Sequence, residues 1–520
     1  MRFLPVHEIR RREAEAIALG TPAEALMERA GNALARAVYR LLGARGGTAC
    51  LAVVGTGNNG GDALVAARLL EQWGLRCTPL LTCAPEALKG AARHAWERYA
   101  AAVPHGRHAV IGDEAGWRTG RPEERLPPRA VVIDGLLGTG TRGVPAGTIR
   151  EAILWIRRAA AWVAIVAVDL PSGLEADTGR GEGAAVVADL TVTFDTPKLG
   201  FQYPAAWPLL GRVETVDLGL PPAGPEPDDD EPCDFLTPAD PDLRLPKRPR
   251  DSHKGDYGHL LVVGGSNGFA GAPALAALAA LRAGAGLVSA VLPASAAGQI
   301  AALAPEAMAH PLPCPRGELD LQAFRQWRPS LDAFDTLVAG PGLGTGEGPR
   351  ALVAALLAAP PARLLLDADA LNLLALERPL KPFASAARVI LTPHPGEAAR
   401  LLGTTAAAVQ ADRPAAVRQL ADATGAVVVL KGCATLVCAP GRRPQMNLCG
   451  NPGMATGGSG DVLAGVIGAL WGQGLDAWAA ARLGVWLHAT AGDLAAWRGG
   501  ERTLIARDLV GELGAAAALL

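Results

Sequence analysis

The sequence predicts an α/β protein of two domains, each built on a parallel sheet that helices cover on both faces. A chain of 520 residues is too long for a single core of ordinary size. Short runs that are apolar throughout alternate with longer amphipathic stretches, which is typical of buried parallel strands and their connecting helices. Residues 220–233 are rich in Pro and acidic residues and have no periodicity, so we expect a solvated linker there.

The first domain is expected to span residues 1–219 and to form a Rossmann-like, doubly wound sheet. Its predicted strands are residues 49–55, 77–82, 130–135, 163–169 and 189–194. Helices are predicted around residues 8–42, 62–73, 86–102 and 147–160.

The second domain is expected to span residues 234–520 and repeats the same alternation. Its predicted strands are residues 259–265, 286–292, 335–342, 363–369, 388–396 and 426–432. A helical stretch follows most of them, which again indicates a parallel α/β sheet.

Composition and charge exclude several classes of protein. The formal net charge is −2 and half of the residues are hydrophobic, so nothing indicates nucleic-acid or membrane binding. Eight cysteines occur without a C-x-x-C pair, which favours reduced thiols in a cytoplasmic protein over disulfides or a zinc site. The first 17 residues carry charges at helical spacing and predict no signal peptide. Pro293 interrupts a long uncharged stretch, residues 283–305, which is therefore not expected to span a membrane.

A glycine-rich turn follows the first predicted strand. Gly55, Gly57 and Gly60 spell G-x-G-x-x-G, a pattern that lets a backbone approach a pyrophosphate at a helix N-terminus. A dehydrogenase fingerprint would place a ribose-binding acid at the end of the second strand, but that strand ends with "PLLTCAPE". A Walker loop is excluded because the dipeptide Gly-Lys never occurs.

Three strand ends in the first half carry polar turns that could meet at one edge of the sheet. Their oxygen-bearing side chains include Asn59, Asp134 and Ser172, which suit a hard monovalent cation. The loop "GLLGTGTRGV" offers backbone N–H groups and Arg142 to an anion. Tight connections and helix caps are the alternative interpretation of these turns.

The second half contains a segment suited to phosphoryl transfer, "NPGMATGGSGDVLAG". Its turn, Gly457 to Gly460, leads into Asp461 and an apolar helix, so backbone N–H groups and the helix dipole could hold a phosphoryl group. Asp461 is placed to take a proton from an attacking hydroxyl, although Asp also caps helices.

Other loops of the second half carry polar groups at strand ends. Lys431 lies in "LKGCATLV" and suits nucleotide phosphates, and His394 lies in the Pro-flanked turn "LTPHPGE", facing substrate or serving the fold alone. The glycines of the loop at 339–346 indicate that another group approaches its backbone closely. The segment "DADALNLL" (367–374) places two carboxylates near a possible metal.

These motifs together resemble the bifunctional NAD(P)H-hydrate repair enzymes across nearly the whole chain outside the linker. The first half resembles the NAD(P)H-hydrate epimerase domain through "NNGGDALV", "IDGLLGTGTRGV", "DLPSGL" and "TFDTPKLG". The second half resembles the ADP-dependent dehydratase of ribokinase-like fold through "SHKGDYGHLLVVGGS", "GPGLG", "TPHPGE", "KG" and "NPGMATGGSGDVLAG".

For the first half the resemblance implies epimerisation of hydrated NADH and NADPH (NADHX and NADPHX), in which water has added at C6 of the nicotinamide ring. It implies a potassium site at Asn59, Asp134 and Ser172, with Asp169 as a catalytic residue. The implied substrate-binding residues are Asn58, Asn59, Gly60, Gly61, Asp62, Gly138, Thr139, Gly140, Thr141, Arg142, Gly143, Val144 and Asp169.

For the second half the resemblance implies dehydration of the S form, with ADP and magnesium, giving AMP and phosphate. Asp461 would be the catalytic base. The implied substrate-binding residues are Ala272, Gly342, Gly344, His394 and Asp461. The implied nucleotide-binding residues are Lys431, Gly432, Cys433, Ala434, Thr435 and Gly460.

The sequence departs from the family pattern at one position. Similar sequences read N-N-G-G-D-G, whereas Ala63 follows Asp62 here, which would strain a position that needs φ > 0.

Two other functions are compatible with these motifs. A small-molecule kinase that stops at a phosphorylated product is one alternative. A non-catalytic interaction or RNA-binding module is the other, although Asn59, Asp134 and Asp169 are all present. We also expect a homo-oligomer.

Overall fold

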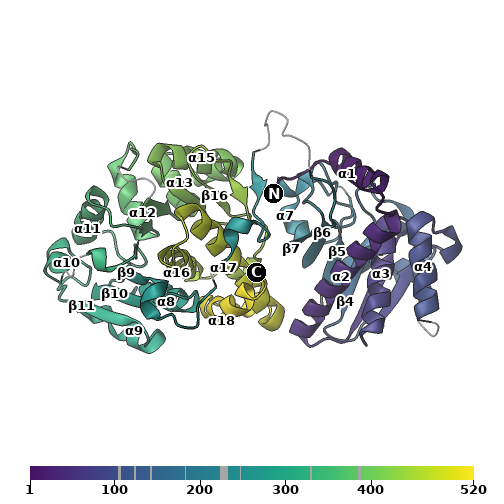
Figure 1. Cartoon of the computed structure of the whole chain (residues 1–520), viewed down its shortest axis with the longest axis horizontal. Helices are drawn as coiled ribbons and strands as arrows, with labels where there is room; N and C mark the ends of the chain where they lie inside the picture. The colour runs from purple at the N-terminus through teal and green to yellow at the C-terminus, as the bar shows by residue number, and fades with distance from the viewer. Residues whose placement is uncertain are drawn as a thin grey trace. The chain divides into compact units, whose positions relative to one another are not determined.

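The computed structural model describes residues 1–103, 107–121, 125–140, 143–181, 183–222, 232–245, 247–327, 331–383 and 388–520. The chain forms two compact units, Met1–Asp230 and Glu231–Leu520 (Figure 1). The division falls within the segment 220–233 that the sequence analysis treats as a linker, and most of that segment lies outside the described residues. We call the two parts unit 1 and unit 2.

Unit 1 contains a parallel sheet of seven strands in the order β3-β2-β1-β4-β5-β6-β7. The strands are β1 (Ala49–Val54), β2 (Arg76–Leu81), β3 (Ala109–Val110), β4 (Val131–Gly135), β5 (Ala164–Val168), β6 (Leu190–Phe194) and β7 (Arg212–Val216). The five predicted strands are confirmed, and β3 and β7 were not predicted. The strand order reverses between β1 and β4, and the crevice at such a switch point is where open sheets bind ligands.

Helices cover both faces of this sheet. They are α1 (Val6–Ala18), α2 (Ala23–Arg45), α3 (Asn58–Gln72), α4 (Gly90–Ala102), α5 (Glu114–Thr119), α6 (Gly147–Ala159) and α7 (Trp207–Leu210). Helices α2, α3 and α4 pack side by side (Figure 1), while α5 and α6 pack together over a core that includes Trp117 and Trp155. The helical stretch predicted around residues 8–42 is confirmed as two helices, because Gly20, at φ 102°, and Pro22 separate α1 from α2.

Unit 2 contains a sheet of ten strands in the order β11-β10-β9-β12-β13-β14-β15-β16-β17-β8. The strands are β8 (Asp234–Phe235), β9 (His259–Val263), β10 (Leu287–Pro293), β11 (Met308–Leu312), β12 (Thr336–Ala339), β13 (Leu364–Leu366), β14 (Val389–Leu391), β15 (Val427–Leu430), β16 (Leu436–Cys438) and β17 (Gln445–Met446). The six predicted strands are confirmed. Strands β16 and β17 add antiparallel pairs to the otherwise parallel sheet.

The helices of unit 2 are α8 (Gly271–Arg282), α9 (Gly298–Leu303), α10 (Leu321–Trp327), α11 (Glu347–Ala358), α12 (Asp369–Leu374), α13 (Pro395–Leu402), α14 (Ala406–Ala411), α15 (Arg413–Thr424), α16 (Ser459–Gly472), α17 (Ala477–Gly499) and α18 (Ala506–Ala517). Helix α16 packs against α8 and α17 and is buried from Val462 to Trp471 (Figure 1). Gly465 permits this packing, because a Cβ there would lie 2.1 Å from the Ala276 carbonyl oxygen. No helix in the described ranges is long and apolar enough to cross a membrane.

Candidate functional site

The carboxyl ends of β1, β4 and β5 bring the predicted cation ligands of unit 1 together. Ser172 Oγ donates a hydrogen bond to Asp134 Oδ1 at 2.6 Å, and the Ser172 N–H donates to Oδ2 at 2.8 Å. The Asn59 amide donates to the carbonyl oxygens of Leu137, at 3.0 Å, and Val168, at 2.5 Å. Because the Leu137 N–H donates to Ser172 Oγ at 2.9 Å, all three predicted ligands surround one stretch of backbone.

Asp134 is fully buried, and no cationic side chain among the described residues pairs with it. Burial raises the pKa of Asp134 to about 6, although hydrogen bonds from Ser172 and Leu136 favour the ionised form. A buried carboxylate without a countercharge, surrounded by hydroxyl and carbonyl oxygens, fits a monovalent cation.

The glycine-rich stretch after β1 is helical sooner than expected. Helix α3 begins at Asn58, so Asp62 lies inside the helix and not at its start. Gly60 has an ordinary helical φ and is needed for space, since a Cβ there would lie 2.1 Å from the Gly55 carbonyl oxygen. Ala63 is a buried helical residue without positive φ, so this departure from the family pattern introduces no backbone strain.

The predicted anion loop after β4 lies against helix α1. Arg10 of α1 donates to the Thr139 carbonyl oxygen at 3.1 Å, and both residues line a pocket of about 240 Å³. Gly143 has a φ of 81°, and Val144 is exposed. The predicted residues Thr141 and Arg142 lie outside the described residues. Arg10 was not predicted, because nothing in a helical charge pattern distinguishes it from a solvated side chain.

Asp169 lies directly after β5 in the left-handed region, at φ 68°. Its Oδ1 accepts hydrogen bonds from the Phe194 N–H at 3.1 Å and from Thr193 Oγ1 at 3.3 Å, and it lies 2.5 Å from Lys198 Nζ. Lys198 is only 1% exposed. The sequence contains this lysine in the motif "TFDTPKLG", but its pairing with Asp169 could not be predicted from sequence.

Two more carboxyl groups lie near Asp169. Burial raises the pKa of Asp62 well above its usual value, and the charges of Asp169 and Glu13 raise it further. Burial and Asp169 also raise the pKa of Glu13, which lies on α1. The unit therefore brings three carboxyl groups, those of Glu13, Asp62 and Asp169, to one edge of its sheet.

In unit 2, Asp461 lies in the first turn of α16, three residues after Gly458, the N-cap in left-handed conformation. Burial raises the pKa of Asp461 to about 7; the charge of Asp367 adds to this rise, and Lys431 opposes it. A carboxyl group that titrates near neutral pH is suited to accept a proton from an attacking hydroxyl.

Lys431 follows β15 and contacts carboxylates from two neighbouring strand ends. Its Nζ lies 2.5 Å from Asp367 Oδ1 and 3.8 Å from Glu397 Oε2. Thr392 Oγ1 also donates to Asp367 Oδ1, at 2.8 Å. Gly460 is adjacent, because a Cβ there would lie 3.5 Å from Lys431 Nζ. The predicted nucleotide residues Lys431 and Gly460 therefore lie together, near Asp461.

His394 caps helix α13 and borders the same cluster. Its Nδ1 accepts hydrogen bonds from the N–H groups of Gly396, at 2.9 Å, and Glu397, at 3.4 Å. Its Nε2 lies 3.3 Å from Glu397 Oε1, and half of the side chain is exposed. Burial raises the pKa of Glu397 to about 7. His394 therefore has a structural role as a helix cap, and its half-exposed ring borders the Lys431 cluster; its contact with substrate stays a prediction.

The glycine loop after β12 joins this group through Asp369. Gly344 N–H donates to Asp369 Oδ2 at 2.9 Å, and Asp369 in turn contributes to the raised pKa of Asp461. Gly342 has a φ of 60°, and a Cβ there would lie 3.3 Å from Ala272 Cβ. Ala272, Gly342 and Gly344 are therefore neighbours at the edge of the sheet where Asp461 lies.

The remaining predicted nucleotide residues form the loop from Gly432 to Thr435. Buried Arg413 of α15 donates to the carbonyl oxygens of Lys431, at 3.3 Å, and Ala434, at 3.4 Å. Ala434 is in the left-handed region, at φ 52°, and Cys433 is exposed. Arg413 was not predicted, because it lies 18 residues from Lys431 in an ordinary helical stretch.

Helix α17 contacts the segment "NPGMATGGSGDVLAG" at Asn451 and Ser459. His488 Nε2 lies 2.9 Å from the Ser459 carbonyl oxygen, and burial lowers the pKa of His488 to about 4. Asp493 accepts hydrogen bonds from the Gly450 N–H at 2.9 Å and from the Asn451 side-chain amide at 3.0 Å. These contacts fix the turn that precedes α16.

The two carboxylates of "DADALNLL" are already bonded within the protein, Asp367 to Lys431 and Asp369 to Gly344. Among the residues that the structure describes, no three or more His, Cys, Asp or Glu side chains are grouped to hold a metal ion.

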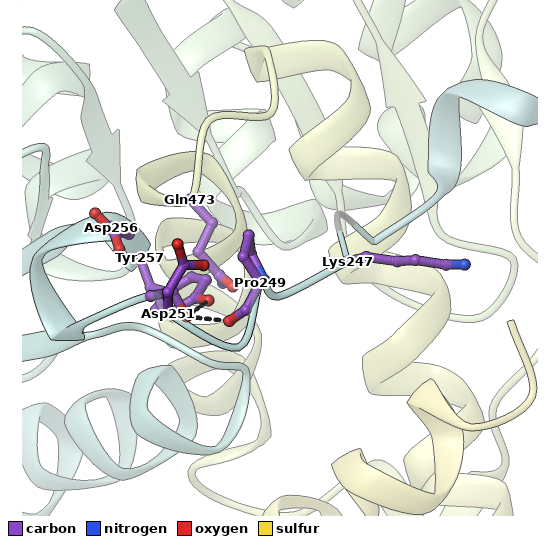
Figure 2. A pocket seen from close by; sticks show the side chains of 7 residues that line it. Lys247, Pro249, Asp251, Asp256, Tyr257 and Gln473 are labelled. Carbon is purple, nitrogen blue, oxygen red and sulfur yellow. Dashed lines mark hydrogen bonds between the residues drawn. The ribbon is translucent and has the colours of Figure 1, made fainter.

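A further pocket of unit 2, of about 310 Å³, lies away from these residues (Figure 2). Tyr257 lies just before β9 and Gln473 caps the C-terminal end of α16, whereas Asp461 lies at the other end of that helix. In Figure 2, Lys247 points away from the other labelled side chains. Gly258 of the motif "SHKGDYG" packs tightly here, because a Cβ would lie 2.4 Å from the Gly472 carbonyl oxygen. Gly258 is therefore needed for close packing against the end of α16.

Comparisons with known proteins agree with this geometry. A family model described as NAD(P)H-hydrate dehydratase matches residues 260–513, and a model of the YjeF-related protein N-terminus matches residues 23–200. In unit 2 the fold is similar to a ribokinase-like superfamily protein from Enterococcus faecalis, with a TM-score of 0.50 and 25% identity, covering 56% of this chain and 98% of that one.

Two curated relatives match nearly the whole of this chain. The bifunctional NAD(P)H-hydrate repair enzyme Nnr of Moorella thermoacetica is 41% identical over 94% of this chain and 91% of its own length. The enzyme of the same name from Escherichia coli is 39% identical over 97% of this chain and 92% of its own length. The chain therefore belongs to the family of bifunctional NAD(P)H-hydrate repair enzymes.

Proposed function

We propose that the chain restores hydrated NADH and NADPH to their active forms. Unit 1 interconverts the R and S hydrates, and unit 2 dehydrates the S form with ADP, giving AMP and phosphate. The placement of Asp461 carries this proposal: a carboxyl group with a pKa of about 7 lies in the first turn of a helix, after a glycine turn suited to a phosphoryl group.

The dehydration would take place in two steps. Asp461 takes the proton of the C6 hydroxyl while the hydroxyl oxygen attacks the β-phosphorus of ADP. The bond between the β-phosphorus and the oxygen of AMP then breaks, and AMP leaves. The C6–O bond then breaks, phosphate leaves with the electron pair, a proton leaves C5, and the C5–C6 double bond forms. The N–H groups at the start of α16 stabilise the charge on the transferred group.

The nucleotide would lie along the loop from Lys431 to Thr435, with Gly460 opposite. Lys431 balances the charge of Asp367 and so lowers the cost of bringing phosphates to this edge of the sheet. Magnesium would enter with ADP, because Mg²⁺ is commonly bound by one or two carboxylates together with substrate phosphates. Asp367 and Asp369 are the carboxylates that influence Asp461 most directly.

Epimerisation would require the nicotinamide ring to open at the hemiaminal carbon C6 and to close again. When the C6–N1 bond breaks, N1 receives a proton and the hydroxyl gives one up, leaving an aldehyde; closure on the other face reverses both transfers. Asp169 would take the hydroxyl proton, and Asp62, whose pKa burial raises well above its usual value, would supply the other. Asn59, Asp134 and Ser172 would hold potassium beside this site.

The test is to identify the product that unit 2 makes from the S hydrate with ADP and magnesium. We expect AMP, phosphate and restored dihydronicotinamide in equal amounts. A stable phosphorylated product would instead identify a small-molecule kinase. Tight RNA binding with a steep salt dependence and no turnover would favour the non-catalytic alternative.

A further inference from the structure

Lys198 is buried at the epimerase site, and its ammonium group is saturated with oxygen partners. Besides Asp169 Oδ1 at 2.5 Å, it donates to Thr193 Oγ1 at 3.1 Å and to the carbonyl oxygens of Phe194 and Thr196, each at 3.3 Å. A lysine with this many fixed partners and 1% exposure has no freedom to reach a ligand. Its effect on a reaction must therefore pass through the group that it contacts.

The contacts of Asp169 are concentrated on one of its two oxygens. Oδ1 receives Lys198, Thr193 Oγ1 and the Phe194 N–H, whereas no described residue donates a hydrogen bond to Oδ2. The residue is also held in a left-handed conformation that is uncommon for aspartate. One oxygen is thus fixed by the protein while the other is left for a ligand, an arrangement that orients a general base.

We propose that Lys198 is a positioning residue of the epimerase reaction: it fixes the Asp169 carboxylate through Oδ1 so that Oδ2 is oriented to accept the substrate proton. This inference rests on the proposed epimerase function of unit 1. It assigns a role to a residue outside the implied substrate and potassium ligands.

The charges around Asp169 explain why a fixed cation is needed. Glu13 faces it from α1 and Asp62 from α3, and Asp195 faces Lys198 from the segment after β6. Arg12 of α1 is paired with Asp195 and is not available to Asp169. Without Lys198, three carboxyl groups would share this edge without a dedicated cation, and their mutual repulsion would no longer be balanced.

The test compares Lys198→Met with the parent chain in epimerase kinetics measured from pH 5 to 9.5. We expect kcat at pH 7 to fall on the order of 10²-fold, with KM little changed. The acidic limb of the kcat profile should move upward by at least one pH unit, so that activity returns at high pH. Lys89→Met, which changes an exposed lysine of unit 1, is the matched control and should keep the parent profile.

A purely structural role would lower the amount of folded enzyme without moving the pH limb, and that result would overturn the inference. If Lys198→Met does not fold, Thr193→Val decides, because it keeps the shape and both charges while removing one donor from Asp169. We expect a severalfold loss of kcat and an upward shift of the same limb; an unmoved limb would overturn the inference. A parent chain without epimerase activity would refute the proposed function itself, and this inference with it.

Discussion

Asp461 and Asp134 are both buried carboxyl groups whose pKa is raised, but their surroundings prepare them for different tasks. Asp461 lies among Asp367, Asp369 and Lys431 at the start of a helix, where a proton can be taken up and released. Asp134 is enclosed by hydrogen-bond donors and oxygen atoms of the backbone, and no described residue supplies it with a positive charge. The first is suited to proton transfer and the second to cation binding.

Replacing Asp461 by Asn should reduce dehydration of the S hydrate at least 10²-fold, because the amide cannot accept the hydroxyl proton. ADP binding, measured by calorimetry, should stay within a few fold of the parent value. The exposed Asp422→Asn on α15 is the matched control and should retain full turnover. Undiminished turnover in Asp461→Asn would exclude Asp461 as the base.

The pH dependence of dehydration follows from the same group. A base must be ionised, and the pKa of Asp461 is about 7, so kcat should fall tenfold per pH unit below this value and level off above it. Glu397 also titrates near pH 7, and a Glu397→Gln variant separates the two contributions. A limb that persists in Glu397→Gln belongs to Asp461; a flat profile between pH 5 and 8 would contradict the assignment.

Potassium should stabilise unit 1 through Asp134. The folded-state pKa of about 6 lies above the unfolded value, so this group contributes stability below pH 4 that is lost as the pH rises through 6. A bound cation compensates for the ionised carboxylate, and the rise in Tm on adding KCl over choline chloride should be larger at pH 8 than at pH 5. Asp134→Asn should remove the difference between the salts; an unchanged difference would place potassium elsewhere.

At the scale of elements, α3 and α16 both follow glycine-rich turns but need their glycines for different reasons. At α16 the N-cap Gly458 has a φ of 92°, which only glycine adopts readily. At the start of α3 the limit is space, since Gly60 packs against the Gly55 carbonyl oxygen and Gly138 against Asn59 Oδ1. One sequence pattern therefore corresponds to two structural demands.

Gly60→Ala should destabilise unit 1 by about 3 kcal/mol, because its Cβ would meet a backbone oxygen that cannot move away cheaply. Gly43→Ala in α2 is the matched control: no atom lies within 4 Å of its added Cβ, and helical propensity should raise the free energy of unfolding by about 0.5–1 kcal/mol. Chemical denaturation measures both. Equal effects of the two variants would refute the close-packing explanation.

The elements show what sequence reasoning could and could not reach. Strands that are apolar throughout, such as β1 and β15, were predicted because full burial leaves a clear pattern. Strand β7 was missed because Arg212 and Glu214 interrupt that pattern, and β3 because two residues are too few. The break between α1 and α2 was missed although Gly20 and Pro22 signal it, since the amphipathic pattern continues on both sides.

Site residues divide in the same way. Those in local motifs, such as Asp134 at a strand end and Asp461 after a glycine turn, were singled out because their chemistry follows directly from a local pattern. Arg10, Lys198 and Arg413 were not, because each acts through a contact with a distant segment that only the folded chain shows. Whether the singled-out residues bind substrate remains a prediction for the experiments above.

At the scale of the whole molecule, the two candidate sites lie in separate compact units of one chain. Asp169→Asn should therefore slow epimerisation on the order of 10²-fold while leaving dehydration of purified S hydrate at the parent rate. In mixtures of the R and S hydrates, the loss of epimerisation should appear as a slow second phase in the recovery of dihydronicotinamide. Equal loss of both activities would contradict two independent sites.

The central claim is that one chain both interconverts and dehydrates the two hydrates. The most direct measurement mixes the protein with R and S hydrates of NADH, potassium, magnesium and ADP, and follows the near-UV absorbance of the restored dihydronicotinamide. Our account predicts complete recovery of both forms, faster than spontaneous epimerisation allows. Recovery that stops when the S form is consumed would contradict an epimerase in unit 1, and no recovery at all would contradict the repair function.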